Sequence, residues 1–530
     1  MKIFSVVKSR WSIQQGRKRP DQHASTTKGR GLSDELALVH PRVVDETVVA
    51  GGLLVESVLR SVTVEFIHGL IVLLTAAEDE QHDRADDEQR DAANDPRQRV
   101  ESAARLSEGG QCGNGYLKRG LHGDTVPSTS DSPGERHRFL TWSGIFFVIS
   151  ARRATALNYA CRMDFADSGR STLGIEWELA VVDASSGELA GFGPQIVAAI
   201  DDPRIVTEYM TNTVELVTGV HTCIPEAVAE LAELRELLRQ ATAQRGLAFI
   251  GSGSHPTSSW RDATIRDTER FTTMREESKA WADRLAIWGL HTHIGVESRA
   301  KVAPVMHVLT ATSPVLLAAS ASSPFWCRED TGFASHRTML FQQLPHAGTP
   351  PAFRSWAEIE EMVDHYIASG IIQSATELRW EIRPTPRFGT IEVRVADGAT
   401  GLDDLAALTA FTHAIAEATS RALDRGTRMP ALCELPLWAH KTNRWRAARY
   451  GTGMEVIQYV GSSGTPLARV ADELIDWAMP AASSLGCVAE LERFSGLVRE
   501  NSADRQRARL AASAGRFEPL LQELIAAARG

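Results

Sequence analysis

The chain has 530 residues and a formal net charge of −10, which is enough length for two or three domains of ordinary size. Its 43% apolar and 23% charged residues are typical of a globular protein. The mildly acidic balance argues against nucleic-acid binding, which usually needs a basic surface. The cysteines lack the short paired spacings of zinc or redox sites, which predicts reduced thiols in a cytoplasmic protein. They are Cys112, Cys161, Cys223, Cys327, Cys433 and Cys487.

Residues 1–162 differ in composition from the rest of the chain. They contain long runs rich in Asp, Arg, Gln and Gly with weak periodicity, which predicts a mostly disordered extension. The most apolar stretch, 48–76, is interrupted by Glu56, Arg60 and other polar residues, so we expect no membrane span. Clear patterns begin just after Met163, and one interpretation is therefore an upstream extension from a misassigned start codon. The alternative is an additional domain of unknown role.

Residues 163–530 show helical and strand patterns in irregular alternation. Apolar residues at helical spacing predict four helices, which cover 225–246, 270–289, 301–324 and 404–426. Short segments with alternating apolar and polar residues lie between them and predict strands. No glycine-rich phosphate loop or dinucleotide fingerprint opens a helix. The pattern favours an α+β fold around an antiparallel sheet.

Five predicted strands carry an apolar face and a charged face. They are GIEWELAVVD (174–183), NTVELVTG (212–219), GLHTHIGVE (289–297), ELRWEIRP (377–384) and GTIEVRVAD (389–397). Since side chains alternate along a strand, the polar faces carry Glu176, Glu178, Glu215, His291, His293, Glu377, Arg379, Glu381, Arg383, Glu392 and Arg394. A sheet with one face in water would explain the alternation. Solvent faces favour Thr, Ser, Lys and Gln, however, and these five segments contain no Lys, so a shared site is favoured.

The residue types on these polar faces indicate a particular chemistry. Several carboxylates with one or two imidazoles suit a hard cation, Mg²⁺ or alternatively Mn²⁺, better than zinc. Carboxylates, a divalent cation and arginines together are the groups that phosphoryl transfer requires. A cation between Glu176 and Glu178 would also relieve the repulsion between these two neighbouring carboxylates.

The same segments resemble a known family. GIEWELAVVD, EYMTNTVELVTG, GLHTHIGV, ASSPFW, EDTGFAS, MLFQQLP, RWEIRPTPRFGTIEVRVADG and NRWRAARYG are similar to blocks of the carboxylate–amine ligases of the glutamate–cysteine ligase type 2 family. The resemblance covers nearly all of 163–530 and none of 1–162. It implies a glutamine synthetase-like catalytic domain, with a curved antiparallel sheet, helices packed on its convex side and the site on its concave face.

The resemblance also implies a reaction with small-molecule substrates. ATP, with Mg²⁺, phosphorylates a carboxylate to an acyl phosphate, and an amine then displaces phosphate to give an amide. For the namesake activity, L-glutamate and L-cysteine give γ-glutamylcysteine. Short exposed apolar segments are compatible with a homodimer.

Carried over residue by residue, the resemblance assigns roles to the polar residues. It implies metal ligation by Glu176, Glu178, Glu208, Glu215, His291 and Glu392, and it places His293 and Arg394 at the nucleotide phosphates. Arg379 and Arg383 are candidates for the transferred phosphoryl group or the substrate carboxylate. In KTNRWRAARYG (441–451), Lys441, Asn443, Arg446 and Arg449 would close over the nucleotide or the acyl phosphate. Read alone, that segment would be a charged surface helix.

Two other functions stay open on the residues. A metal-dependent hydrolase would use His291, His293 and the glutamates to activate water, although the arginines on the same face argue against it. A non-catalytic nucleotide- or metabolite-binding protein could retain the same fold.

Overall fold

The computed structural model describes residues 163–530, so the predictions for residues 1–162 lie outside the described residues. The strands are β1 (Leu173–Asp183), β2 (Ile205–Thr207), β3 (Thr213–Val217), β4 (Leu247–Ile250), β5 (Gly289–Gly295), β6 (Phe325–Trp326), β7 (Glu329–Asp330), β8 (Ile382–Thr385), β9 (Thr390–Asp397), β10 (Glu455–Val456) and β11 (Thr465–Pro466). The α-helices are α4 (Gly193–Ile200), α5 (Ile224–Ala243), α6 (Glu269–Ser278), α7 (Arg299–Ser320), α8 (His336–Phe341), α9 (Trp356–Ala368), α10 (Leu402–Arg425), α11 (Leu437–Tyr450), α12 (Leu467–Leu485), α13 (Val488–Arg499), α14 (Ser502–Ala512) and α15 (Glu518–Arg529).

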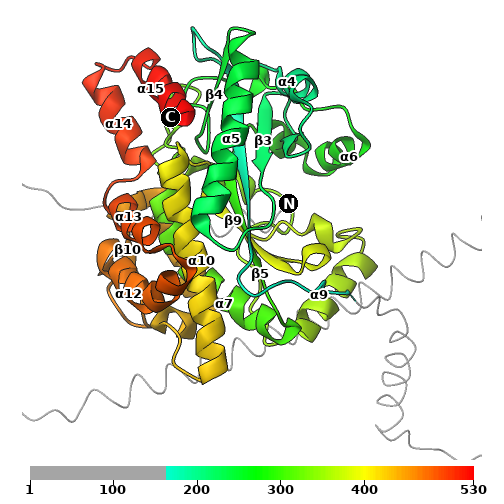
Figure 1. The fold of residues 1–530 in the computed structure, drawn as a ribbon, viewed down its shortest axis with the longest axis vertical. Coiled ribbons are helices and arrows are strands. Elements are labelled where there is room, and N and C mark those ends of the chain that lie inside the picture. The colour runs from blue at the N-terminus through cyan, green and yellow to red at the C-terminus, as the bar shows by residue number, and fades with distance from the viewer. Residues whose placement is uncertain (1–162) are drawn as a thin grey trace, which may run out of the picture. The chain divides into compact units, whose positions relative to one another are not determined.

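Seven strands form one sheet in the order β2-β3-β1-β5-β9-β8, with β4 paired to the second half of β1. Every neighbouring pair in this sheet is antiparallel. Strands far apart in the sequence therefore lie side by side, as β5 and β9 do in Figure 1. This arrangement confirms the predicted α+β fold with an antiparallel sheet.

One face of the sheet forms the main hydrophobic core. Ile175, Trp177 and Leu179 of β1 are at most 1% exposed, and they belong to one apolar cluster with residues of α5, α7 and α10. Helices α5 and α10 lie next to each other across this face (Figure 1). Burying one such side chain stabilises the fold by about 1.5–3 kcal/mol. Because side chains alternate between the two faces along a strand, the charged residues of the same strands lie on the opposite face.

Helix α7 is the central core helix. Within residues 163–530 it alone has the length and hydropathy of a membrane span, and 89% of that stretch is buried inside the fold. Its predicted range, 301–324, overlaps the observed Arg299–Ser320. The predicted helices 225–246 and 404–426 likewise correspond to α5 and α10.

Two predicted elements are shorter than expected. The helix predicted over 270–289 ends at Ser278, because Lys279 takes a positive φ of 47° and a short 3-10 helix follows over Lys279–Arg284. The strand predicted over 377–384 begins only at Ile382. Backbone hydrogen bonds from Gly348 to the carbonyl of Arg379, and from Glu381 to the carbonyl of Gly348, hold the preceding residues against another loop instead.

Glu381 is not part of the cavity lining. It is buried and forms a bidentate ion pair with Arg444 of α11. A strand pattern cannot assign faces where the backbone is not a regular strand.

Candidate active site

Charged side chains from five strands form a continuous row across the polar face of the sheet. On β1, Glu176 lies opposite His291 of β5, and Glu178 lies opposite Glu215 of β3. The row continues where His293 of β5 lies opposite Glu392 of β9, which in turn lies opposite Arg383 of β8. Because paired residues of antiparallel strands point to the same side, the register brings these groups together.

His291 is held as a neutral imidazole with one free nitrogen. Its ring is 2% exposed, and its Nδ1 lies 2.9 Å from Oε2 of Glu176. Burial, together with the nearby positive charge of Arg394, lowers the pKa of His291 to about 4. With Nδ1 donating to Glu176, Nε2 carries the lone pair, and this buried atom has no hydrogen-bond partner. A buried lone pair without a donor is suited to a metal ion.

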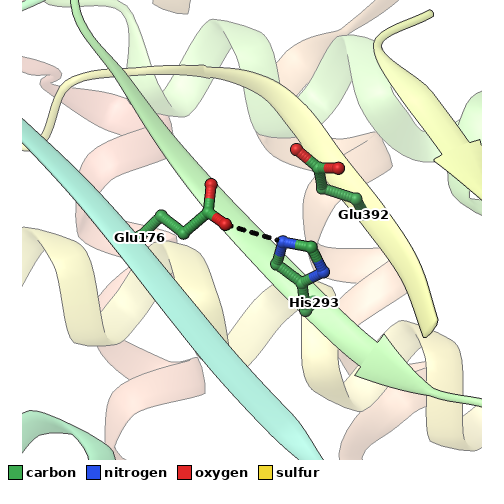
Figure 2. A group of neighbouring side chains, drawn as sticks. All are labelled: Glu176, His293 and Glu392. Atoms are coloured by element: carbon green, nitrogen blue, oxygen red, sulfur yellow. Dashed lines mark hydrogen bonds and ion pairs between the residues drawn. The ribbon is translucent and has the colours of Figure 1, made fainter. Parts of the chain in front are cut away.

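His293, Glu176 and Glu392 form a second group beside it (Figure 2). Nε2 of His293 lies 3.1 Å from Oε1 of Glu176, and Nδ1 lies 3.1 Å from the hydroxyl of Thr390. Burial opposes ionisation of Glu176, but the hydrogen bonds with His291 and His293 hold its pKa well below the usual range. This carboxylate is therefore anionic and shared between the two imidazoles.

Glu392 is fixed by two arginines. It is 1% exposed, accepts a hydrogen bond from Nε of Arg383 at 2.7 Å, and also pairs with Arg394. Burial works to raise its pKa, but Arg394 and Arg383 hold it far below the usual range. Glu392 thus keeps its negative charge and orients both guanidinium groups.

Three further carboxylates gather at the other end of the row. Burial and the charge of Glu208 raise the pKa of Glu178 to about 7. Burial and the charges of Glu176, Glu208 and Glu178 raise the pKa of Glu215 well above its usual range. Glu208 directly follows β2 and accepts a hydrogen bond from the backbone of Tyr209 at 2.9 Å. Such mutual repulsion is relieved by a bound cation.

The donor groups fit divalent metal ions. Two sets of ligand atoms each lie within 4.8 Å of one another, namely Glu176 with Glu215 and His291, and Glu176 with His293 and Glu392. Both sets are rich in carboxylate oxygens, which favours Mg²⁺ or Mn²⁺ over zinc. Together with the free Nε2 of His291, the residues present therefore fit the predicted metal.

A cavity of about 670 Å³ lies over this row. Of the predicted site residues, it is lined by Glu176, Glu178, Glu208, Glu215, His291, Arg379, Arg383 and Arg394. Helix α6 contributes Phe271, Met274 and Glu277 to the same walls. The volume is in the range of small-molecule sites.

The predicted arginines occupy different positions in the cavity. Arg394 and Arg383 pair with Glu392, whereas Arg379 lies 3.9 Å from Glu277 and 3.4 Å from the ring of His346. Burial lowers the pKa of Arg379, and the charges of Glu277 and Glu377 offset this effect only in part. Arg379 therefore belongs to the wall shared with α6 rather than to the carboxylate row.

The four residues predicted from the segment 441–451 do not line this cavity. Asn443 is 1% exposed, and its amide bonds both the N–H and the carbonyl of Ile457 at 2.8 and 2.9 Å. Arg446 donates to the carbonyl of Glu455, Arg449 contacts Gly332, and Lys441 is exposed. Their predicted nucleotide contacts stay predictions.

Arg337 lines the cavity, although the sequence assigned no role to this residue. It lies in the short helix α8, outside every strand whose alternation identified the other residues. Its position next to the EDTGFAS block was the only signal in the sequence.

Comparison with known proteins agrees with this geometry. The family described as "Glutamate-cysteine ligase family 2" matches residues 172–523. A Mycolicibacterium vanbaalenii protein named "Putative glutamate--cysteine ligase 2-1" is 40% identical over 349 residues, which cover 66% of this chain and 91% of that protein. A Clavibacter sepedonicus protein named "Putative glutamate--cysteine ligase 2" is 38% identical over 370 residues, which cover 69% of this chain and 96% of that protein.

Among solved structures, glutamate–cysteine ligase from Francisella tularensis in complex with AMP is similar in fold. The match has a TM-score of 0.52 at 14% sequence identity and covers 68% of this chain and 89% of that one. At this identity the likeness concerns the fold alone. The family match and the two relatives, in contrast, extend over most of the described residues, and the chain therefore belongs to glutamate–cysteine ligase family 2.

Proposed function

We propose that the protein is an ATP-dependent carboxylate–amine ligase that forms an amide through an acyl phosphate. The observation that carries this proposal is the convergence of six acidic and imidazole groups with Arg383 and Arg394 on one face of the sheet. Five of the six groups line the cavity, namely Glu176, Glu178, Glu208, Glu215 and His291, and the sixth, Glu392, pairs with both arginines. A metal-activated hydrolase needs the carboxylates and imidazoles, but it has no comparable need for the arginines.

The residues of the site have different roles in phosphoryl transfer. Bound at the two ligand groups, Mg²⁺ would supply positive charge to the polyphosphate. Glu176 and Glu392 hold that charge in place, and the short contacts of Glu392 aim Arg383 and Arg394 into the cavity. Guanidinium groups fixed in this way stabilise negative charge that develops on a moving phosphoryl group.

The reaction proceeds in two displacements. An oxygen of the substrate carboxylate attacks the γ-phosphorus of ATP, and the bond from that phosphorus to ADP breaks. The amine nitrogen then attacks the acyl carbon, phosphate leaves, and the nitrogen loses a proton. An amine held in the cavity next to the acyl phosphate would compete effectively with water for the acyl carbon.

The names of the relatives support a choice of substrates. We infer the γ-carboxylate of L-glutamate as acceptor of the phosphoryl group and L-cysteine as the amine. The carboxylate-rich ligand sets support Mg²⁺ as the metal, and the cysteines without paired spacings support the cytoplasm as the location. The match covers 91% of the relative that has this name. The cavity is also large enough for small molecules of this kind.

The test is ADP release by the full chain with Mg·ATP. We expect release only when a carboxylate and an amine are both present, with glutamate and cysteine as the first pair and other amino acids and small amines as a panel. Product mass identifies the amide. Tight Mg·ATP binding without ADP release for every pair would instead support a non-catalytic nucleotide-binding protein. Turnover of an amide or ester without nucleotide would support a hydrolase.

A further inference from the structure

Arg337 is a buried cation whose guanidinium donates no direct hydrogen bond to a carboxylate. Its side chain is about 6% exposed, and the nearest acidic oxygen of an ion pair, Oδ1 of Asp397, is 3.9 Å away. Nη2 donates to the carbonyl of Arg394 at 3.1 Å, and Nη1 lies 3.5 Å from the carbonyl of Val395. Nε is buried without a partner. Carbonyl groups orient this guanidinium, and Asp397 offsets its charge only through the long contact of 3.9 Å.

The other buried arginines of the site region are compensated differently. Arg383 and Arg394 share Glu392, and Arg444 forms its bidentate pair with Glu381 outside the cavity. Arg379 has a contact as long as that of Arg337, 3.9 Å to Glu277, but it lies at the wall shared with α6. A buried charge without such a partner is costly unless something else supplies the opposite charge. Arg337 lines the cavity, so an anion bound there can supply that charge.

Gly289 shows where the guanidinium lies relative to the metal ligands. A Cβ atom at this position would come within 2.2 Å of Nη2 of Arg337 and 2.8 Å of Nε2 of His291. The two nitrogens therefore flank the same point on the polar face of β5, and the N–H of Gly289 donates to Glu178. Arg337 thus borders the free nitrogen of His291 on the floor of the cavity.

The backbone of Arg337 is anchored independently of any ligand. Its N–H donates to the hydroxyl of Ser323 at 3.1 Å, and that hydroxyl donates to Asp397 at 2.6 Å. Asp397 is fully buried at the end of β9, and it also accepts from the hydroxyl of Ser335, which caps α8. The position of the guanidinium is therefore fixed before substrate binds, as electrostatic stabilisation requires.

We propose that Arg337 is a further catalytic residue, which places Nη2 against the anionic oxygens of the phosphoryl group as it passes from ATP to the substrate carboxylate. This inference rests on the proposed ligase function. Arg337 takes part in no covalent step, and its role is to stabilise the charge that the phosphoryl oxygens carry while the bond to ADP breaks and the bond to the carboxylate forms. An interaction with the phosphoryl oxygens that is stronger in the transition state than in bound ATP raises kcat more than it lowers KM.

The test compares Arg337→Gln and Arg337→Lys with wild type in the full chain. We expect kcat for ADP release to fall by about 10²- to 10³-fold in Arg337→Gln, with KM for ATP changed much less. The same variant should bind Mg·ATP nearly as well as wild type, and should lose affinity for Mg·ADP with aluminium fluoride, a mimic of the transferring phosphoryl group. Arg337→Lys keeps the charge but loses the planar fork, so an intermediate kcat is expected.

Two controls separate this role from a structural one. Arg444→Gln removes a buried arginine outside the cavity, and it should lower the melting temperature without lowering kcat per folded molecule. Added guanidinium ion should partly restore kcat in Arg337→Ala and have no such effect on Arg444→Gln. If Arg337→Gln retains kcat and aluminium fluoride affinity, or if it loses only stability as Arg444→Gln does, the inference is wrong. Failure of wild type itself to release ADP with every substrate pair would overturn the ligase proposal instead.

Discussion

The 2.9 Å contact between Nδ1 of His291 and Oε2 of Glu176 decides the state of the site, because it leaves the lone pair of the imidazole on the buried Nε2. Glu176 makes a second contact, with His293, through its other oxygen. One carboxylate is thus common to both candidate metal groups, and its removal should affect both at once.

Glu176→Gln should therefore remove most Mn²⁺ binding at both groups. We expect wild type to bind two Mn²⁺ per chain, and the affinity at each group to fall by about 100-fold in the variant. Glu215→Gln belongs to one group only, so it should spare the other. Electron paramagnetic resonance of bound Mn²⁺ measures the stoichiometry. Glu236→Gln on the exposed side of α5 serves as the control, and equal loss of both ions in Glu215→Gln would contradict the two-group arrangement.

Mg²⁺ binding should release protons near neutral pH. The pKa of Glu178 is raised to about 7 and that of Glu215 well above its usual value, so these carboxyls carry protons that a cation displaces. For the proton displaced from Glu178, the apparent affinity should rise by about tenfold per pH unit below pH 7 and level off above it. Calorimetry in buffers of different ionisation enthalpy gives the proton count, and a pH-independent affinity between pH 6 and 8 would argue against the shift.

Glu178→Gln should stabilise the metal-free protein at alkaline pH. The pKa of Glu178 is raised from the ordinary value of 4.5, which applies to the unfolded state, to about 7 in the folded state. The unfolded state therefore ionises first, and stability is lost progressively as pH rises through that window. At 1.36 kcal/mol per pKa unit, the loss is about 3 kcal/mol above pH 7. Urea unfolding without metal should show the variant more stable than wild type at pH 8, and the difference should shrink by pH 5.

Gly289→Ala should disturb the site more than the fold. The added methyl would collide with nitrogens of Arg337 and His291, so we expect kcat to fall by about 10- to 100-fold through misplacement of these groups. Gly496→Ala in α13 is the matched control, since a Cβ there meets nothing within 4 Å. The control should keep full activity and gain up to about 1 kcal/mol of stability.

Asn443→Ala separates a structural from a nucleotide-binding role. Its amide forms hydrogen bonds with both backbone groups of Ile457. Loss of these two hydrogen bonds should lower the free energy of unfolding, measured in urea, by about 2–4 kcal/mol. We expect the KM for ATP to stay unchanged in this variant and in Lys441→Ala, whose side chain is exposed. A several-fold rise in that KM for both variants would support the nucleotide contact that the family resemblance implies.

The alternation along strands was sufficient to find most of the carboxylate row. Glu176, Glu215 and Glu392 lie in regular strands, where a period of two fixes the face and an antiparallel register aligns the neighbours. Glu208 lies just beyond the end of β2, where no alternation reaches, and only the resemblance pointed to it.

The remaining differences arise where the chain leaves regular structure. Glu381 follows the alternation in sequence, but hydrogen bonds to the Gly348 loop turn its carboxylate toward Arg444. Arg337 reaches the cavity because helix α8 packs against β9, where its guanidinium donates to the carbonyls of Arg394 and Val395. Such placements depend on contacts between residues distant in sequence, so local periodicity carries no trace of them.

Asp397 accepts from the hydroxyls of Ser323 and Ser335, and this triangle has a consequence for descent with modification. Replacing either serine removes one hydrogen bond that Asp397 accepts, and replacing Asp397 leaves both hydroxyls without this acceptor, so each single change costs stability. Substitutions at these three positions are therefore expected to occur together among related proteins.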